Sequence, residues 1–343
     1  MQISFADARA LVVDVLTQYN VERDHAGIVA DHLIEAAAAG HAFAGLPRVL
    51  ALVDHLKERP PARPITIEQK SRGSALIDGG GTNGYVTSLL GIDKAIELAK
   101  ANGVGIVGIR DTWFSGRLTY YVERAARDGL IAMHTANTQA RVAPAGGIDR
   151  IFGTNPIAFA FPCDPEPLVV DFGTGVTTWG EVLLRQRLGR KLEPGSAVDA
   201  EGQPTTDPGA ALEGAFKAWG GHRGYSLALV IQTLGVLCGS APVIDNVSDC
   251  GFFFLVFDPE LLMPRDQFRA RVTELVRHIE ASRPEPGAAR VRIPGRTSAA
   301  ARAATRARGT IDVDDAIYKR LQALRSGRSG AGADARRGTA GKA

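Results

Sequence analysis

The sequence is poor in cysteine and has no long apolar run, and both absences exclude classes of protein. Its three cysteines, Cys163, Cys238 and Cys250, lie far apart and are odd in number, which argues against a disulfide framework and a cysteine metal site. No run approaches the ~20 apolar residues of a membrane-spanning helix. The N-terminus also lacks the basic segment of a signal peptide. We therefore expect a protein of the reducing cytoplasm, without a membrane partner.

A strong charge of one sign is missing as well. The net charge of the 343 residues is only +3, which is too small to indicate a nucleic-acid partner. Part of this charge lies in residues 326–343, which are rich in Gly, Ala, Ser and Arg. We predict that this tail is disordered, because such a composition buries too little apolar surface to fold.

Three common catalytic motifs are also absent. The chain has no G-x-S-x-G turn, no H-E-x-x-H segment and no P-loop, so the usual markers of serine hydrolases, zinc peptidases and nucleotide triphosphatases are missing. No metal site is predicted. The segment Gly103–Gly108 does match G-x-G-x-x-G, but a predicted helix precedes it and its glycines lie inside an apolar run. We interpret it as a strand with small residues rather than a dinucleotide-binding loop.

What the chain does contain is an alternation of helical and strand-like segments. Helical periodicity over residues 4–20 and 22–39, with Ser4 as N-cap, predicts a helical N-terminal region. Farther along, short apolar runs alternate with helical segments, which is typical of an α/β protein. The predicted strands cover residues 75–78, 104–109, 131–134, 157–161, 168–170 and 251–257, and the predicted helices residues 89–101, 118–128, 225–238 and 265–282.

The stretch 151–181 combines two of these strands with glycine-rich loops. The second strand is followed by a loop that opens with Asp171 and continues to Gly175. Such a loop offers close backbone approach, N–H groups and hydroxyls, which a phosphate or a nicotinamide amide needs. Asp171 can orient a substrate, accept a hydrogen bond from a ribose hydroxyl, or simply cap the turn. An ordinary strand-turn-strand core is the alternative interpretation of the whole stretch.

Several single residues are further candidates. His222 and Arg223 follow two glycines and open an apolar helix, which favours an anion, although a plain helix cap is the alternative. Arg48 can bind a carboxylate or form a surface ion pair. Four other side chains can titrate or donate a proton, and no spacing selects among them: His41, His134, Tyr120 and Tyr121.

Taken in order, these segments resemble the NAD(P)-dependent malate/L-lactate dehydrogenase family, which lies outside the Rossmann type and includes the piperideine- and pyrroline-2-carboxylate reductases. The resemblance runs from about residue 4 to 324. The matching segments are Gly40-His41 with Gly45 and Arg48, Arg110 with Gly116 and Tyr120-Tyr121, Ala143-Pro144 with Gly146-Gly147, Gly153 to Ala158, Val170-Asp171 with Gly180, Asp199 to Pro208, Gly221 to Tyr225, and Ile293 to Gly295.

The resemblance implies a fold as well as an activity. The expected fold is α/β, a family-specific non-Rossmann NAD(P)-binding fold with a mixed sheet, helices on both faces and a helical N-terminal region. We expect this helical region over residues 1–70, the NAD(P)-binding domain over 71–300, and C-terminal helices that pack back over 301–325. A homodimer and a small-molecule substrate that carries a carboxylate are also implied.

The resemblance also assigns site residues by position. Arg48 would hold the substrate carboxylate. The nicotinamide cofactor would be bound by three segments: Val170, Asp171, Phe172, Gly173, Thr174 and Gly175, then His222 and Arg223, and finally Gly295 and Arg296.

The chain departs from the family pattern at the expected proton donors. The family typically reads G-x-D-S-H-G-x-x-R near the N-terminus, and its His protonates the substrate oxygen. Here Ala44 stands at the His position and Phe43 at the Ser position. The second frequent His, in N-H-F-G, is Phe114, which follows Trp113. Both usual imidazoles are therefore missing.

This departure favours an imine substrate over a ketone. Reduction of a ketone needs an acid, and general acid catalysis contributes roughly 10²- to 10⁴-fold, whereas an iminium accepts hydride without one. A site for an iminium substrate needs a carboxylate clamp, an apolar wall and an anion. These would be supplied by Arg48 as the clamp, by Phe43, Ala44, Trp113 and Phe114 as the wall, and by Asp171 as the anion. We expect reduction of a C=N bond in a cyclic or α-imino acid.

Two other functions stay open. One is a 2-oxoacid/2-hydroxyacid dehydrogenase whose acid has moved to His41, Tyr120, Tyr121 or water. The other is a cofactor-binding protein without turnover. The expected cofactor is NADPH, or else NADH, because the imine-reducing branch of the family leans to NADPH. Arg223, Arg185, Arg187 and Arg190 can meet a 2′-phosphate, although a solvated basic face is the more ordinary reason for the last three.

Overall fold

A computed structural model describes residues 1–247 and 249–327. The predicted disordered tail therefore lies outside the described residues from position 328 on. The chain divides into two compact units, one formed by Met1–Pro61 together with the chain from Thr297 on, the other by Ala62–Arg296. The domain boundaries expected at residues 70 and 300 stay predictions. No helix in the described parts is long and apolar enough to cross a membrane.

The first unit is helical and uses both ends of the chain. Ser4 caps its first helix by accepting a hydrogen bond from the Asp7 N–H at 3.0 Å, as predicted. A short strand before that helix pairs antiparallel with a strand near the C-terminus. The elements are β1 (Gln2–Ser4), α1 (Phe5–Thr17), α2 (Arg23–Ala38), η1 (Ala42–Ala44), α3 (Arg48–Glu58), α10 (Arg296–Arg308), β12 (Thr310–Asp312) and α11 (Asp315–Arg325).

An ion-pair cluster joins α2 to α10 within this unit. Glu35 of α2 contacts Arg302 at 3.0 Å and Arg306 at 2.8 Å. Arg302 is only 7% exposed, so the carboxylate of Glu35 helps to compensate a largely buried charge. Helix α10 is thereby fixed to α2.

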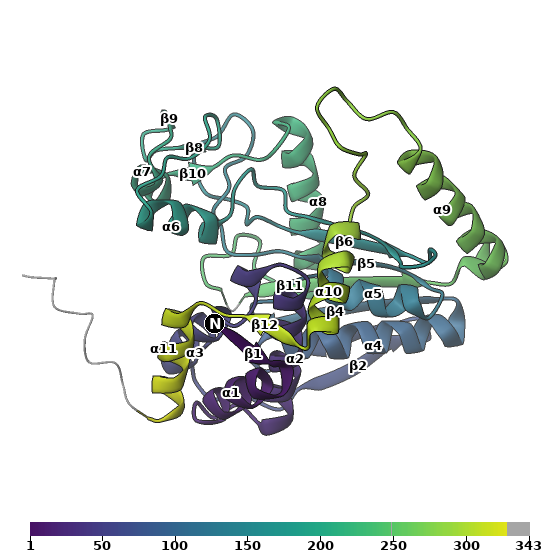
Figure 1. The fold of residues 1–343 in the computed structure, drawn as a ribbon, viewed down its shortest axis with the longest axis horizontal. Coiled ribbons are helices and arrows are strands. Elements are labelled where there is room, and N and C mark those ends of the chain that lie inside the picture. Colours follow the sequence, from purple (N-terminus) through teal and green to yellow (C-terminus); the bar gives the residue numbers. More distant parts are fainter. Residues whose placement is uncertain (248, 328–343) are drawn as a thin grey trace, which may run out of the picture. The chain divides into compact units, whose positions relative to one another are not determined.

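The second unit contains a seven-stranded mixed sheet (Figure 1). Its strand order is β2-β3-β4-β11-β5-β6-β7, in which β3 and β4 are parallel and all other neighbours antiparallel. The strands are β2 (Thr66–Ser71), β3 (Ser74–Asp78), β4 (Val104–Thr112), β5 (Ile131–Ala136), β6 (Ile157–Phe161), β7 (Leu168–Phe172) and β11 (Cys250–Phe257). The predicted α/β class with a mixed sheet is confirmed.

Helices cover both faces of this sheet, with α4 (Gly84–Asn102) and α5 (Thr119–Arg127) on one side and α8 (His222–Cys238) on the other (Figure 1). The glycines of β4 allow this close packing. A Cβ on Gly105 would lie 2.0 Å from the Ala95 carbonyl oxygen of α4, and one on Gly108 would lie 3.1 Å from Cys238 Sγ of α8. The interpretation of this G-x-G-x-x-G segment as a strand with small residues is therefore confirmed.

A smaller three-stranded sheet of order β10-β8-β9 completes the second unit, together with helices α6 and α7 beside it and α9 farther along the chain. These elements are α6 (Trp179–Arg187), β8 (Ala197–Val198), β9 (Pro204–Thr205), α7 (Pro208–Glu213), β10 (Ala215–Phe216), η2 (Pro259–Leu261) and α9 (Arg265–Glu280).

The structure corrects the expectation for the loop that opens with Asp171. Asp171 and Phe172 continue β7, where they pair with Ala158 and Ile157, so the loop begins only at Gly173. The expectation of a buried strand was also wrong in part. β7 lies at the edge of the sheet, and only Val169 among its residues is buried.

Candidate functional site

The loop after β7 is fixed in place by its backbone. The Thr174 N–H donates to the Thr154 carbonyl at 2.7 Å, and its hydroxyl donates to the same oxygen at 3.1 Å. From the other side, the Trp219 indole donates to the Gly173 carbonyl at 2.9 Å, and its backbone N–H donates to the Thr174 carbonyl at 3.0 Å. The glycine-rich loop is therefore an ordered element.

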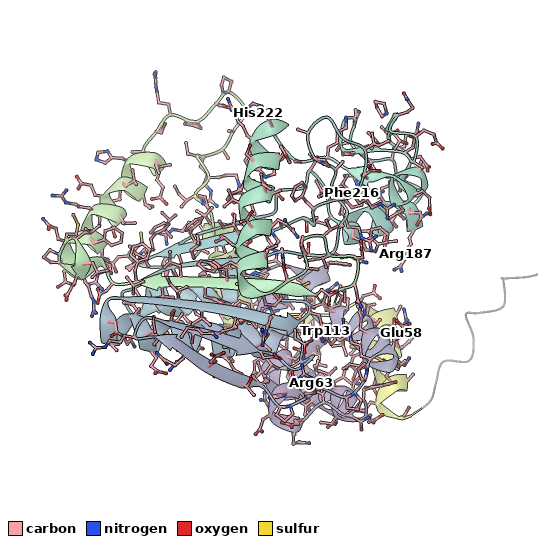
Figure 2. The ribbon with its side chains drawn as sticks, turned by 180° about the vertical axis from the view of Figure 1, so that it is seen from behind. Glu58, Arg63, Trp113, Arg187, Phe216 and His222 are labelled. Carbon is pink, nitrogen blue, oxygen red and sulfur yellow. The ribbon has the colours of Figure 1, made fainter. Side chains whose placement is uncertain are left out.

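Trp219 also connects this loop to the start of α8. It is followed by Gly220 and Gly221, whose φ values of 60° and 61° favour glycine, and then by His222, the first residue of the helix. No side chain caps this helix start, and Figure 2 shows His222 at the end of α8 that points away from the sheet. The structure thus brings the His222-Arg223 turn and the Gly173–Gly175 loop together.

The third predicted cofactor segment also packs on β7. Gly295, at φ +79°, lies so close that a Cβ would be 3.1 Å from the Val169 carbonyl oxygen. The guanidinium of Arg296, in contrast, contacts the turn between β6 and β7, at 3.8 Å from Cys163 Sγ and 3.5 Å from the Asp164 carbonyl oxygen. Gly295 therefore lies beside the strand that carries Asp171, whereas the Arg296 side chain is directed to the opposite end of that strand.

Asp171 has an unusual electrostatic environment. Asp171 lies in the edge strand β7 and keeps exposed surface, and partial desolvation of its carboxylate raises the pKa of this group to about 6. A hydrogen bond from the Thr119 N–H, at 3.3 Å, and the charge of Arg117 favour the ionised form and limit the rise in pKa. This carboxyl group consequently titrates close to neutral pH.

The aromatic pair after β4 contains a strained residue. Trp113 is 1% exposed, and its indole donates to the Gly81 carbonyl at 2.8 Å. Phe114 is half-buried, its ring centre 5.4 Å from that of Trp113, and it adopts φ +55°. A bulky residue in the left-handed region is strained and persists only where its surroundings impose it. The fold thus holds Phe114 in a fixed orientation just before the loop that leads to Thr119.

Four further candidates, His41, Phe43, Ala44 and Arg48, lie in the first unit. His41 Nε2 lies 3.0 Å from the Ser298 hydroxyl. Phe43 is 56% exposed on the short helix η1, which also contains the half-buried Ala44. Gly45 then allows this turn to pack closely on α2, and Arg48 begins α3, half-buried. The turn therefore presents a large aromatic ring to solvent.

Two of the titratable candidates are buried in the core of the second unit. His134 is fully buried, stacked 3.8 Å from the ring of Phe254, and burial lowers its pKa to about 3, so it is neutral. The Tyr121 hydroxyl donates to the Ser115 carbonyl at 2.6 Å, and burial raises its pKa well above the usual value. Tyr120 is half-buried, edge-on to Tyr121. His134 and Tyr121 thus serve the interior of the fold.

Sequence reasoning missed the cation Arg141. Its guanidinium lies 3.7 Å from the ring centre of Trp179, the first residue of α6. These two residues are far apart in the sequence, and nothing in either local segment indicates the contact. Arg185, which was a phosphate candidate, instead pairs with Glu181 at 2.7 Å and Glu193 at 3.2 Å.

Comparison with known proteins identifies the family. The family model described as malate/L-lactate dehydrogenase matches residues 3–322. The L-sulfolactate dehydrogenase of Methanothermobacter thermautotrophicus is 33% identical to the chain, over 94% of this chain and 95% of that protein.

Solved structures agree with this assignment. The sulfolactate dehydrogenase of Methanocaldococcus jannaschii superposes with a TM-score of 0.85 at 31% identity, covering 96% of this chain and 97% of the other. The delta1-piperideine-2-carboxylate reductase of Pseudomonas syringae pvar. tomato gives a TM-score of 0.86 at 27% identity, covering 94% and 99%. The chain therefore belongs to the malate/L-lactate dehydrogenase family and is an oxidoreductase.

Proposed function

We propose that the chain is an NAD(P)H-dependent reductase of the C=N bond in a cyclic or α-imino acid. The observation that carries this proposal is Asp171, a carboxyl group with a pKa of about 6 on the strand that leads into the glycine-rich loop. An ionised carboxylate stabilises a cationic iminium. A protonated imidazole, which ketone reduction would need, is missing at positions 44 and 114.

The residues after β7 fit a nicotinamide cofactor. Around Gly221, no atom lies within 4 Å of the position that a Cβ would occupy, so this turn leaves room for a ligand next to the uncapped start of α8. Backbone N–H groups at a helix start favour phosphate or carboxamide oxygens. A bound reduced nicotinamide would supply the hydride, and Phe172 to Gly175, His222, Arg223 and Gly295 would hold it.

The other candidate residues have roles that suit an imino acid. By its place in the family pattern, Arg48 would bind the carboxylate of an imino acid through paired N–H groups. Within the second unit, the ring of Phe114 beside Trp113 would supply an apolar wall whose π face attracts a cation. Asp171 stays ionised above pH 6 and favours the protonated, reactive form of the imine.

A second candidate function is supported by the relatives. Their names describe sulfolactate dehydrogenases, which favours a 2-hydroxyacid substrate for this chain as well. In that case Asp171 in its protonated form, His41 or Tyr120 would donate the proton to the substrate oxygen.

A substrate panel separates the two functions. The protein is incubated with NADPH or NADH and with a set of cyclic imines and 2-oxo acids, and the absorbance of the reduced cofactor is followed. We expect oxidation of the cofactor with carboxylate-bearing cyclic imines, faster with NADPH. Turnover of 2-oxo acids alone would overturn the imine proposal and favour the second candidate.

A further inference from the structure

Arg141 is a half-buried cation that the catalytic proposal does not use. Its guanidinium carbon lies over the ring of Trp179, 3.7 Å from the ring centre, which is a cation–π contact. The guanidinium has five N–H donors, and its only hydrogen bond to the described residues runs to Gln139 Oε1 at 2.8 Å. Most of its donors therefore face no protein acceptor in the described parts of the chain.

The surroundings of Arg141 add positive charge rather than compensate it. Burial, and then the charge of Arg150, lower the pKa of Arg141. Arg150 is itself held by backbone carbonyls, donating to Gly214 at 2.5 Å and Leu212 at 2.6 Å. Arg185, on the same helix as Trp179, has two carboxylate partners. A partly desolvated cation without a carboxylate is costly unless an anion binds there.

The position of Arg141 connects it to the loop that follows β7. The next residue, Val142, lies against Gly175, where a Cβ would be 3.4 Å from Val142 Cγ2. Trp179 begins α6 directly after the same loop. The cation and its aromatic support thus border the backbone to which the proposed function assigns the cofactor.

We infer that Arg141, supported by the ring of Trp179, binds a phosphate group of the dinucleotide cofactor. This inference rests on the proposed function. Arginine suits the task because its planar fork matches two phosphate oxygens, and the indole beneath it fixes the plane of the fork. The phosphate is either the 2′-phosphate, which only NADPH carries, or the diphosphate, which both cofactors carry.

The test measures cofactor affinity directly, by isothermal titration without substrate. Arg141→Met keeps an unbranched stem on the indole but removes the charge, and Arg141→Lys keeps the charge without the fork. We expect Arg141→Met to bind NADPH roughly 10- to 100-fold more weakly, as for loss of a charged hydrogen bond, with Arg141→Lys in between. A loss confined to NADPH supports the 2′-phosphate, and an equal loss with NADH supports the diphosphate.

The control is Arg271→Ala, an exposed arginine of α9, a helix far from α6 in the same unit (Figure 1). Thermal unfolding confirms that each variant folds. Unchanged affinities for both cofactors in a folded Arg141→Met variant overturn this inference and leave the proposed function standing. If the wild-type protein binds neither cofactor, the proposed function itself fails, and the inference with it.

Discussion

Asp171 combines a position beside the proposed cofactor loop with a pKa of about 6. Below pH 6 the carboxyl is protonated and loses its negative charge, and above pH 6 it is ionised. If it stabilises an iminium, kcat/KM for imine reduction rises with pH through about 6. If it is the acid for a 2-oxo acid, kcat/KM falls over the same interval.

Replacing Asp171 by Asn tests this role. We expect the variant to lose the rise in kcat/KM near pH 6 and to be at least about 10-fold slower with an imine at pH 7.5, because a neutral amide cannot offset the positive charge. The measurement is kcat/KM from pH 5 to 8, with Asp128→Asn, an exposed aspartate paired with Lys100, as control. A flat wild-type profile would exclude Asp171 from this role.

The burial of His134 predicts that the stability of the fold depends on pH. Its folded-state pKa of about 3 lies below the ordinary 6.5, so the unfolded state binds the proton more tightly. The contribution of His134 to the free energy of unfolding is therefore complete above pH 6.5. It decreases as the pH falls toward 3, by up to about 5 kcal/mol.

Urea denaturation at pH 7.0 and pH 4.5 measures this loss. His134→Phe keeps a ring on Phe254 but cannot titrate, so we expect the wild type to lose more stability than the variant between the two pH values. The two proteins are compared by how much their unfolding free energy changes between the two pH values, not by its absolute value. The reason is that the substitution also removes the contact of His134 Nδ1 with the Phe253 carbonyl, at 3.2 Å. An equal change of unfolding free energy with pH in both proteins would show that His134 takes up no proton when the protein unfolds.

For single residues, features that depend on sequence neighbours could be predicted from the sequence, whereas contacts between distant segments could not. Ser4 was identified as a cap because an N-cap depends on the neighbouring residues alone. The environment of Asp171 depends on Thr119, which another segment brings to it. The stacking of Arg141 on Trp179 likewise depends on how distant segments fold together. Whether the predicted site residues bind cofactor and substrate stays a prediction.

Among the elements, α8 has an unusual outer face. Leu229, Val230, Val236 and Leu237 are 47%, 53%, 40% and 72% exposed, and their spacing places them on one stripe of the helix. The opposite face of α8 is already buried against the sheet. A helix face on which four large apolar side chains stay exposed around Thr233 is typical of an interaction surface. We propose that a second copy of the chain covers it, in line with the homodimer that the family resemblance implies.

A charged side chain on this stripe should weaken the dimer. We expect Leu237→Glu to shift the molar mass from that of two chains to that of one, because a carboxylate would be desolvated in the interface. Light scattering after size-exclusion chromatography measures the mass. The control is Leu262→Glu, at a leucine that is 92% exposed outside α8. A wild-type mass of one chain would refute the proposed dimer, and an unchanged dimer in Leu237→Glu would exclude this stripe.

Strands and helices with a periodic apolar pattern could be predicted from the sequence, whereas exposed or very short strands could not. The central strands and the long helices were found because their apolar residues repeat with a clear period. β2 was missed because all six of its residues, Thr66–Ser71, are exposed and mostly polar. The two-residue strands of the small sheet are too short to show a period. An edge strand is defined by its neighbours' hydrogen bonds, which no local pattern records.

At the scale of the whole molecule, the first unit depends on joining both ends of the chain. Glu35→Ala would remove the carboxylate that pairs with both Arg302 and Arg306, so we expect a loss of about 3–5 kcal/mol in unfolding free energy. Glu35→Leu with Arg302→Leu should recover much of this loss, since an apolar pair leaves no buried charge. Urea denaturation measures both, with Glu274→Ala on the exposed face of α9 as control. A Glu35→Ala variant as stable as the wild type would show that the ion pair contributes nothing.

The position of β11 determines when the strands of the large sheet can pair during synthesis. This strand is the last of the seven along the chain, yet it lies between β4 and β5 in the middle of the sheet. A ribosome releases the six other strands first, and until residues 250–257 emerge these strands form two separate groups with unpaired edges. Such edges are open to wrong pairing. We therefore expect the nascent chain to be exposed to wrong strand pairing until residues 250–257 have left the ribosome.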